Sequence, residues 1–351
     1  MMPPVIEALR PLPRVFTDHV KEDVNDAQDC PDQGRTRAMM LGETGLRVPA
    51  VVLGTSSLGR RLDAPDAVAV LRAAIASGWR TWDTSNEYGD AEAFIGSALA
   101  ALDGSAGLDV PAGLDAPVQV FTKVDPAPGS SDFSGARVRA SVTESLDRLG
   151  LDRLPLVHFH DPERMAYADA VAPDGPVRAL LDLREAGTIE HLGVAGGPIG
   201  ILRQYVRTGE FEAVVTHNRF TLLDRSAETL LDDCADRGIG VLNAAPFGGG
   251  ALADDDGPVR SYHYRAVDPA QRDAVLRIRA IARAASVPVG ALALRVGDRD
   301  PRVAGTIVGV TSTAQLAQVA AWAATDVPDD VWPELDAALP DPAHWTGELG
   351  R

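Results

Sequence analysis

Lysine is nearly absent from this sequence. Only two of its 33 basic residues are lysines, and the others are arginines. Lys21 lies in an irregular N-terminal stretch, whereas Lys123 ends the short strand-like run of residues 118–123. Lysine carries a compact point charge on a flexible stem, which suits it to chemical roles that arginine does not fill. An ammonium at the end of a strand is therefore a candidate for a specific function.

Cysteine and long apolar runs are also scarce. Cys30 and Cys234 are too few for a disulfide framework and lack metal-ligand spacing, which fits a reducing compartment. No apolar run reaches the roughly 18 residues that suggest a membrane span. Residues 1–4 begin no basic segment followed by an apolar core, so no signal peptide is expected. These absences predict a cytoplasmic protein.

Positively charged residues are also few compared with negatively charged ones. The chain has 33 lysines and arginines against 50 aspartates and glutamates, a formal net charge of −17. This excess argues against a nucleic-acid partner, which needs a basic face, and against a polybasic membrane-surface segment. We therefore expect a small-molecule substrate, no nucleic-acid partner and no membrane partner. The oligomeric state is left open.

The sequence is rich in short apolar runs that alternate with helical segments. The expected strands are residues 51–54, 80–83, 118–123, 154–160, 189–194, 213–216, 240–243 and 305–308. Short buried strands separated by helices indicate parallel pairing, and eight such units close into an α/β fold, the (β/α)8 TIM barrel. An N-terminal β-hairpin is expected over residues 41–48. Residues 1–37 have no sustained period and are interpreted as a poorly ordered extension, and residues 38–351 as one barrel domain.

Four residues that can exchange protons follow successive expected strands. Asp83, Tyr88, Lys123 and His160 each lie at the C-terminal end of a strand or just past it, where a TIM barrel carries its functional groups. An ammonium about 4 Å from a phenol favours the tyrosinate by roughly 4 kcal/mol before desolvation opposes it. Asp83 can balance that ammonium, and His160 can donate a hydrogen bond to a substrate oxygen. The set predicts a proton-transfer site for a carbonyl or an alcohol.

Each of these residues also has an ordinary structural explanation. Asp83 can cap a turn, Tyr88 can pack on the surface, and a lysine at a strand end can simply be solvated. His158 shares strand parity with His160 and would lie one layer deeper in the barrel, either as a hydrogen-bonded core residue or beside the substrate. All four together at consecutive strand ends favour the functional interpretation.

The same residues belong to a longer pattern. Residues 83–96 read Asp-Thr-Ser-Asn-Glu-Tyr-Gly-Asp-Ala-Glu-Ala-Phe-Ile-Gly, and this run resembles the signature of the aldo-keto reductase superfamily. The resemblance covers about residues 37–325, and its further parts are residues 53–55, 122–123, 145–150 and 222–225. It implies a TIM barrel, a nicotinamide cofactor and no metal. It also implies a tetrad of Asp83, Tyr88, Lys123 and His160, with Tyr88 as the general acid/base.

Three positions depart from the family's common pattern. Ala195-Gly196-Gly197 stands where a Ser-Asn pair usually binds the nicotinamide amide, His217 replaces the usual glutamine, and Ala244 replaces a stacking tyrosine. These departures are similar to a narrower group, the sugar 1-dehydrogenases that oxidise L-galactose, L-fucose or D-threo-aldoses, with pyridoxal dehydrogenase as a relative. The residues expected to contact the cofactor are Gly54, Thr55, Asp83, His217, Pro246, Phe247, Gly248, Gly309, Val310, Thr311, Ser312 and Gln315.

The choice of cofactor follows from charge. NADP binding usually needs a cation beside the 2′-phosphate, and residues 303–335 contain no lysine, arginine or histidine. We therefore expect NAD, with NADP less favoured, and oxidation of an aldose at C1 to an aldonolactone. The alternatives are an NADPH-dependent aldehyde or ketone reductase, a pyridoxal dehydrogenase, and a non-catalytic nicotinamide-binding subunit. The loop of residues 254–269 can cover the substrate through Tyr262, or be a disordered acidic loop.

Overall fold

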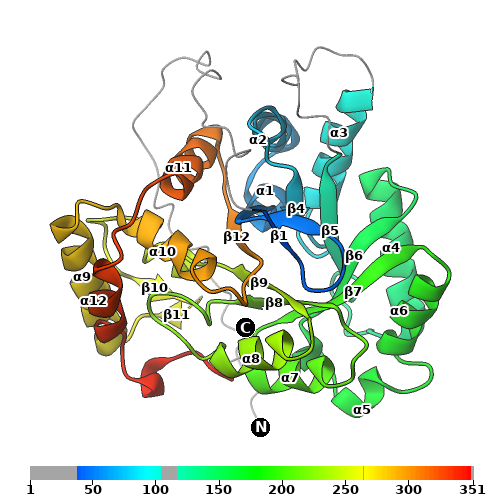
Figure 1. The fold of residues 1–351 in the computed structure, drawn as a ribbon. Helices are drawn as coiled ribbons and strands as arrows, with labels where there is room; N and C mark the ends of the chain where they lie inside the picture. The colour runs from blue at the N-terminus through cyan, green and yellow to red at the C-terminus, as the bar shows by residue number, and fades with distance from the viewer. Residues whose placement is uncertain (1–37, 104–116, 264, 349–351) are drawn as a thin grey trace, which may run out of the picture.

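Eight parallel strands close into a barrel, and helices surround it (Figure 1). The computed structural model describes residues 38–103, 117–263 and 265–348. The barrel strands are β3 (Val51–Gly54), β4 (Thr81–Asp83), β5 (Gln119–Val124), β6 (Leu154–His160), β7 (Ile189–Gly196), β8 (Ala213–His217), β9 (Gly240–Ala244) and β12 (Gly305–Gly309). The last strand, β12, pairs with both β3 and β9 and closes the barrel. The expected TIM barrel is confirmed.

A hairpin covers the N-terminal end of the barrel. β1 (Ala38–Met40) pairs antiparallel with β2 (Arg47–Pro49), and Leu41 in the connecting turn belongs to the apolar cluster inside the barrel. Gly42 has a φ of 56°, and a Cβ there would lie 2.3 Å from the backbone nitrogen of Gly240. Only glycine fits this approach, so the turn of the hairpin packs directly against the first residue of β9.

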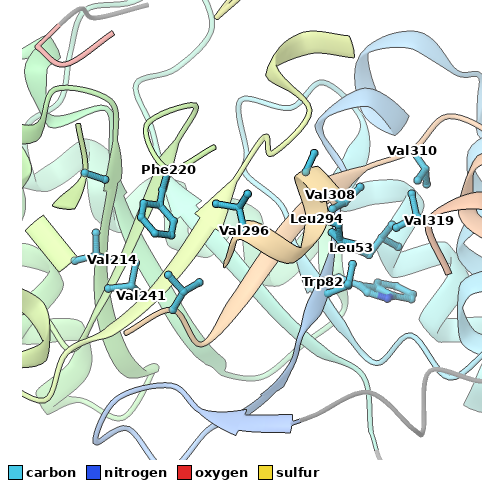
Figure 2. Packing of buried hydrophobic residues seen from close by; sticks show 14 of the residues in the cluster. Leu53, Trp82, Val214, Phe220, Val241, Leu294, Val296, Val308, Val310 and Val319 are labelled. Carbon is cyan, nitrogen blue, oxygen red and sulfur yellow. The ribbon is translucent and has the colours of Figure 1, made fainter. Parts of the chain in front are cut away.

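Helices cover the outside of the barrel strands. They are α1 (Ser56–Arg61), α2 (Ala64–Ala76), α3 (Ala91–Asp103), α4 (Gly135–Leu149), α5 (Tyr167–Ala170), α6 (Pro176–Glu185), α7 (Ile199–Val206), α8 (Glu228–Ala235), α9 (Pro269–Ala284), α10 (Val289–Asp298), α11 (Thr313–Ala323) and α12 (Val331–Ala337). Figure 2 shows the packing between the two layers, where Leu53, Trp82 and Val308 lie near Val319 of α11. Because the strands are buried on both faces, their sequences are nearly continuous apolar runs.

Local signals explain where individual elements begin and end. The Ser134 side chain accepts a hydrogen bond from the Arg137 nitrogen at the start of α4, and Gly150 ends that helix with a φ of 68°. Helix α9 begins at a capping box formed by Asp268 and Gln271. The alternation of strands and helices in the sequence did not predict α9 and α10, which lie between the seventh and eighth barrel strands.

Two expectations concern the ends and the surroundings of the domain. The extension expected over residues 1–37 lies outside the described residues. Within the described ranges, no single helix is long and apolar enough to cross a membrane, and α9 with α10 passes by length and composition only as a pair bent by 99°.

Candidate active site

A buried ion pair joins the ends of two neighbouring strands. The Nζ atom of Lys123 on β5 lies 2.8 and 2.7 Å from Oδ1 and Oδ2 of Asp83 on β4, and it donates to the Thr84 carbonyl oxygen at 2.7 Å. Both side chains are almost fully buried. Burial opposes the charge, but Asp83 and then Tyr88 outweigh it and raise the pKa of Lys123. The ammonium is therefore held charged at the base of the site.

Tyr88 and His160 complete the expected group of four. The Lys123 Nζ atom lies 4.7 Å from the centre of the Tyr88 ring, and the Tyr88 and His160 rings meet edge-on at 5.9 Å. The loop that carries Tyr88 packs closely on α1, because a Cβ on Gly59 would come within 1.9 Å of the Tyr88 carbonyl oxygen. The structure brings all four side chains together at the C-terminal ends of β4, β5 and β6.

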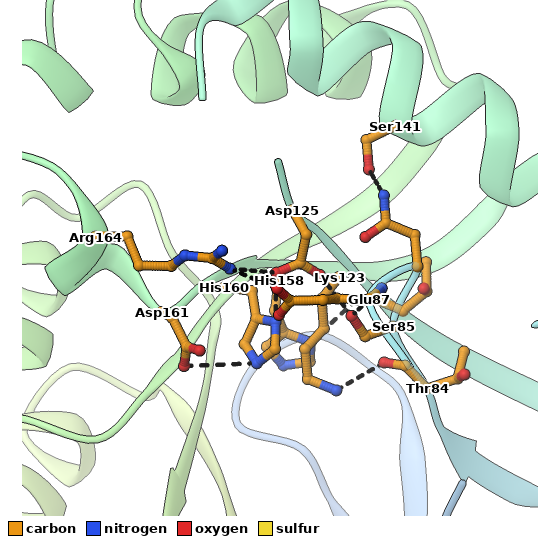
Figure 3. Close-up of polar contacts among 12 residues, drawn as sticks. Thr84, Ser85, Glu87, Lys123, Asp125, Ser141, His158, His160, Asp161 and Arg164 are labelled. Carbon is orange, nitrogen blue, oxygen red and sulfur yellow. Dashed lines mark hydrogen bonds and ion pairs between the residues drawn. The ribbon is translucent and has the colours of Figure 1, made fainter. Parts of the chain in front are cut away.

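Asp125 is a site residue that the sequence analysis missed. It follows β5 directly, is fully buried, and its Oδ1 atom lies 2.7 Å from Nδ1 of His160 (Figure 3). The Ser85 hydroxyl donates to its other oxygen at 2.5 Å. Burial opposes ionisation, but His160 and then Ser85 outweigh it and lower the pKa of Asp125. One signal was available: Asp125 shares strand parity with Lys123 and therefore points to the same side.

Arg164 supplies positive charge to the rim of this network. Its Nη1 atom lies 3.1 Å from Oε1 of Glu87 and 3.6 Å from Oδ1 of Asp125. Glu87, Asp125 and His160 offer ligand atoms within 4.8 Å of one another. That spacing alone does not make a metal site, because the Arg164 guanidinium already lies against the two carboxylates.

His158 lies deeper in the barrel, as strand parity predicted. It is fully buried, its Nδ1 atom lies 3.4 Å from the Thr122 carbonyl oxygen, and its Nε2 atom has no hydrogen-bond partner among the described residues. Burial and then the charge of Lys123 lower its pKa to about 3. Gly193 on β7 makes room for the ring, since a Cβ there would lie 2.3 Å from Cδ2. His158 is therefore a neutral core histidine.

The residues expected to hold the cofactor's phosphates lie at the ends of β3 and β12. Gly54 and Gly309 are paired across these strands, and Gly309 is exposed. Ser312 caps α11, and Oε1 of Gln315 accepts hydrogen bonds from the Thr311 nitrogen at 2.8 Å and hydroxyl at 3.0 Å. The exposed first turn of an 11-residue helix beside two glycines fits an anionic nucleotide. A ligand that uses the Thr311 nitrogen must displace the Gln315 side chain.

The remaining expected cofactor residues have different surroundings. Thr55 is fully buried and its hydroxyl donates to the Asp83 carbonyl oxygen at 3.0 Å. His217 ends β8, and its ring stacks on His263 with centroids 5.7 Å apart. Phe247, in the loop after β9, packs edge-on against Trp322 of α11 at 5.3 Å. The other expected residues, in the loops after β9 and β12, are Pro246, Gly248 and Val310. Because β9 lies between β8 and β12, these loops share one side of the barrel mouth.

Tyr262 lies in a small hairpin, β10 (Ser261–Tyr262) with β11 (Arg265–Ala266). Its side chain is buried, and its hydroxyl donates to the Asn218 carbonyl oxygen at 2.8 Å and lies 2.8 Å from the Thr221 hydroxyl. Burial raises its pKa. Both hydrogen bonds are made within the protein, so a contact between Tyr262 and substrate stays a prediction that requires this hairpin to move.

Comparison with known proteins gives one family. The model described as the aldo/keto reductase family matches residues 50–340. A D-threo-aldose 1-dehydrogenase from a Pseudomonas species is 33% identical over 85% of this chain and 97% of its own length. L-galactose dehydrogenase from Arabidopsis thaliana is 30% identical over 79% of this chain and 84% of its own. Pyridoxal 4-dehydrogenase from Microbacterium luteolum is 30% identical over 84% and 95%.

The solved structures agree on the fold. An aldo-keto reductase from Bacillus halodurans, in its holo form, superposes with a TM-score of 0.70 at 20% identity, covering 88% of this chain and 98% of that one. At that identity the likeness supports the barrel architecture alone.

Proposed function

The chain belongs to the aldo/keto reductase family, and we propose that it oxidises the C1 hydroxyl of an aldose to an aldonolactone with NAD⁺ as its cofactor. Membership of the family makes it an oxidoreductase that uses a nicotinamide cofactor. The sugar substrate and the preference for NAD are the parts that we propose.

The observation that carries the proposal is the assembly of four side chains at one end of the barrel. Lys123 is buried and paired with Asp83 at 2.7 Å, and its ammonium lies 4.7 Å from the centre of the Tyr88 ring. His160 lies edge-on to the same ring. A cation fixed beside a phenol and an imidazole suits proton exchange with an alcohol or carbonyl oxygen.

The division of work follows from the chemistry of the groups. A nicotinamide cofactor held at this end of the barrel would supply the hydride chemistry. The protein has to orient the substrate oxygen and exchange its proton, and Tyr88 and His160 are the groups placed for this task. Asp83 keeps Lys123 charged and in place, which holds an electropositive environment beneath the phenol.

Two features support an aldose as the substrate and NAD as the cofactor. Two of the relatives are named for oxidation of aldoses, D-threo-aldose 1-dehydrogenase and L-galactose dehydrogenase. Residues 303–335 contain no basic residue, so the segment around α11 offers no side-chain cation to the 2′-phosphate of NADP. The exposed turn at Thr313, Ala314 and Gln315 would hold the phosphates shared by both cofactors.

A second candidate substrate is pyridoxal. The pyridoxal 4-dehydrogenase relative is 30% identical over a similar share of the chain, 84%. Pyridoxal, like an aldose, presents an oxidisable hemiacetal hydroxyl, so the same proton-transfer groups serve either substrate.

The proposal is tested by initial rates of absorbance change at about 340 nm, the nicotinamide band. The panel combines NAD⁺ or NADP⁺ with L-galactose, L-fucose, D-arabinose and pyridoxal. NAD⁺-dependent turnover of an aldose supports the proposal, and turnover of pyridoxal alone selects the second candidate. NADPH-dependent reduction of simple aldehydes without sugar oxidation contradicts it. Cofactor binding without any consumption points to a non-catalytic subunit.

A further inference from the structure

A partly exposed ion pair lies beside the buried proton-transfer group. Nη1 of Arg164 lies 3.1 Å from Oε1 of Glu87, and the two side chains are 34% and 30% exposed, whereas the neighbouring Asp125 is fully buried. A carboxylate oxygen of Glu87 lies within 4.8 Å of a ring nitrogen of His160. Figure 3 shows these side chains converging from the loops after β4 and β6. The pair therefore forms a solvent-facing edge of the site.

Both members of the pair are held in place by the protein. The backbone nitrogen of Glu87 donates to the Ser85 hydroxyl oxygen at 3.1 Å, and that hydroxyl in turn donates to Asp125 at 2.5 Å. Nη2 of Arg60 donates to the Glu87 carbonyl oxygen at 3.2 Å. Arg164 is held from the other side, because its Nη1 atom also lies 3.6 Å from Oδ1 of Asp125. Groups that are fixed before a ligand arrives lose little entropy when they bind it.

The chemistry of the pair matches neighbouring hydroxyl groups. A carboxylate offers about four acceptor sites and a guanidinium five N–H donors. Glu87 and Arg164 use one oxygen and one N–H on each other, which leaves acceptors and donors side by side at a surface that is a third exposed. A sugar hydroxyl both donates and accepts, and hydrogen bonds to a charged partner are the stronger kind. The pair is therefore suited to a polyol rather than to an apolar substituent.

We propose that Glu87 and Arg164 bind the hydroxyls on the carbons that follow C1 of the aldose and thereby select a polyhydroxylated substrate. This inference deepens the proposed function and rests on it. Tyr88 remains the group that exchanges the proton, and the C1 oxygen lies between Tyr88 and His160. The hydroxyls on the next carbons then reach the Glu87 carboxylate and the Arg164 guanidinium at the edge of the site.

Charge restricts this selection to neutral sugars. The carboxylates of Glu87, Asp125 and Asp161 lie around His160, against the single guanidinium of Arg164. The buried ammonium of the group of four already has its own carboxylate. The sum stays negative whatever charge His160 carries, so a phosphorylated or carboxylated sugar meets repulsion. We therefore expect the unmodified aldose to be a better substrate than its phosphate ester.

Two conservative variants test the pair through kinetics. Glu87→Gln keeps the size of the side chain and removes its charge, whereas Arg164→Lys keeps the charge and loses the planar fork. Each should raise KM for the most active aldose about 10-fold or more, the value of a hydrogen bond to a charged group, with kcat and NADH affinity unchanged. Glu185→Gln is the matched control, because it breaks an exposed ion pair with Arg178 on α6 and should leave KM unaltered.

Deoxy sugars separate substrate contact from a merely structural role. The variants and the unaltered protein are compared on the aldose and on analogues that each lack one hydroxyl. The loss in the variants should disappear for the analogue that lacks the hydroxyl in contact with the pair. Equal losses on the aldose and on every analogue would show that the pair only supports the site, and they overturn the inference. An unchanged KM in both variants overturns it as well.

Binding without turnover distinguishes this inference from the proposed function. The 1,5-anhydro derivatives of the panel's aldoses keep the ring hydroxyls but lack the C1 hydroxyl, so calorimetric titration into the protein with NADH needs no reaction. We expect binding to the unaltered protein and about 10-fold weaker binding to Glu87→Gln. That result in a protein that oxidises no aldose removes the proposed function and keeps the role of the pair. Aldose oxidation with equal binding by both proteins, or with no binding at all, keeps the function and overturns the inference.

Discussion

The guanidinium of Arg219 lies against Gly197, the residue directly after β7. A Cβ on Gly197 would come within 2.9 Å of Nη2 and 3.0 Å of Nη1. Arg219 is fully buried, and it donates from Nε to the Gly347 carbonyl oxygen at 2.8 Å and from Nη1 to the His217 carbonyl oxygen at 2.9 Å. Gly197, directly after β7, therefore makes room for an arginine that ties the C-terminal segment to the end of β8.

Filling this space should disturb that connection. We expect Gly197→Ala to lower the free energy of unfolding by about 1–3 kcal/mol, the usual cost of overpacking a close-packed site. Urea unfolding of the variant and the unaltered protein measures the difference. Unchanged stability would show that Arg219 moves away freely and does not hold the C-terminal segment.

The Lys123–Asp83 pair predicts a particular pattern in a double-mutant cycle. Lys123→Met leaves the Asp83 carboxylate buried without its counter-ion, and we expect a loss of about 3–5 kcal/mol in the free energy of unfolding. Asp83→Asn combined with Lys123→Met should cost less than Lys123→Met alone, because the uncompensated charge is gone. Equal losses in the single and double variants would contradict the coupling.

His158 predicts how stability depends on pH. Its pKa is about 3 in the folded protein, against an ordinary value of 6.5. Between these pH values His158 is protonated in the unfolded chain and neutral in the folded protein. The free energy of unfolding therefore falls as the pH drops below 6.5. His158→Leu should flatten this dependence between pH 6.5 and about 5.5, above the range in which glutamates titrate. An unchanged slope in urea unfolding across that range would show that another group is responsible.

The cofactor argument can be tested by adding the missing charge. Ser312 and Thr311 lie at the start of α11, in a stretch without basic residues. Thr311→Arg should raise kcat/KM for NADP⁺ relative to NAD⁺ by up to about fivefold, the value of a solvent-exposed ion pair of about 1 kcal/mol. Thr311→Gln, similar in length and neutral, is the control. Strong NADP⁺ turnover by the unaltered protein would place the binding cation elsewhere in the chain.

Tyr88 is expected to act on turnover and not on cofactor binding. Tyr88→Phe removes the hydroxyl that we propose exchanges a proton with the substrate oxygen, while the ring keeps its contacts with Lys123 and His160. We expect kcat to fall by about 100-fold or more, with NADH affinity unchanged in fluorescence titration. A variant with near-normal kcat would remove Tyr88 from the mechanism.

The barrel and the group of four could be read from the sequence because both depend on local patterns. The expected strand at residues 154–160 agrees with β6, and the strand ends placed Asp83, Lys123 and His160 at one face. Those signals need only alternation along each strand and the parallel order of the strands.

What the sequence did not reveal depends on contacts between distant residues. Asp125 meets His160 across 35 positions, and Arg219 reaches Gly347 across 128. No local period reports such a contact. Tyr262 is expected to contact the substrate because its loop is long enough to cover the site; its side chain is buried in the structure, and the contact stays a prediction. Asp268 and Gln271 form a capping box that marks the start of helix α9. The alternation of strands and helices predicted only the helices of the barrel units.

The most direct test of the account follows the hydrogen on C1. The protein is incubated with NAD⁺ and an aldose that carries deuterium at C1, with the most active sugar of the panel as substrate. Mass spectrometry then measures the NADH and the sugar product. The account predicts one deuterium in the NADH and an aldonolactone, or the acid that forms from it, as the product. Turnover that leaves the deuterium on the sugar would contradict oxidation at C1.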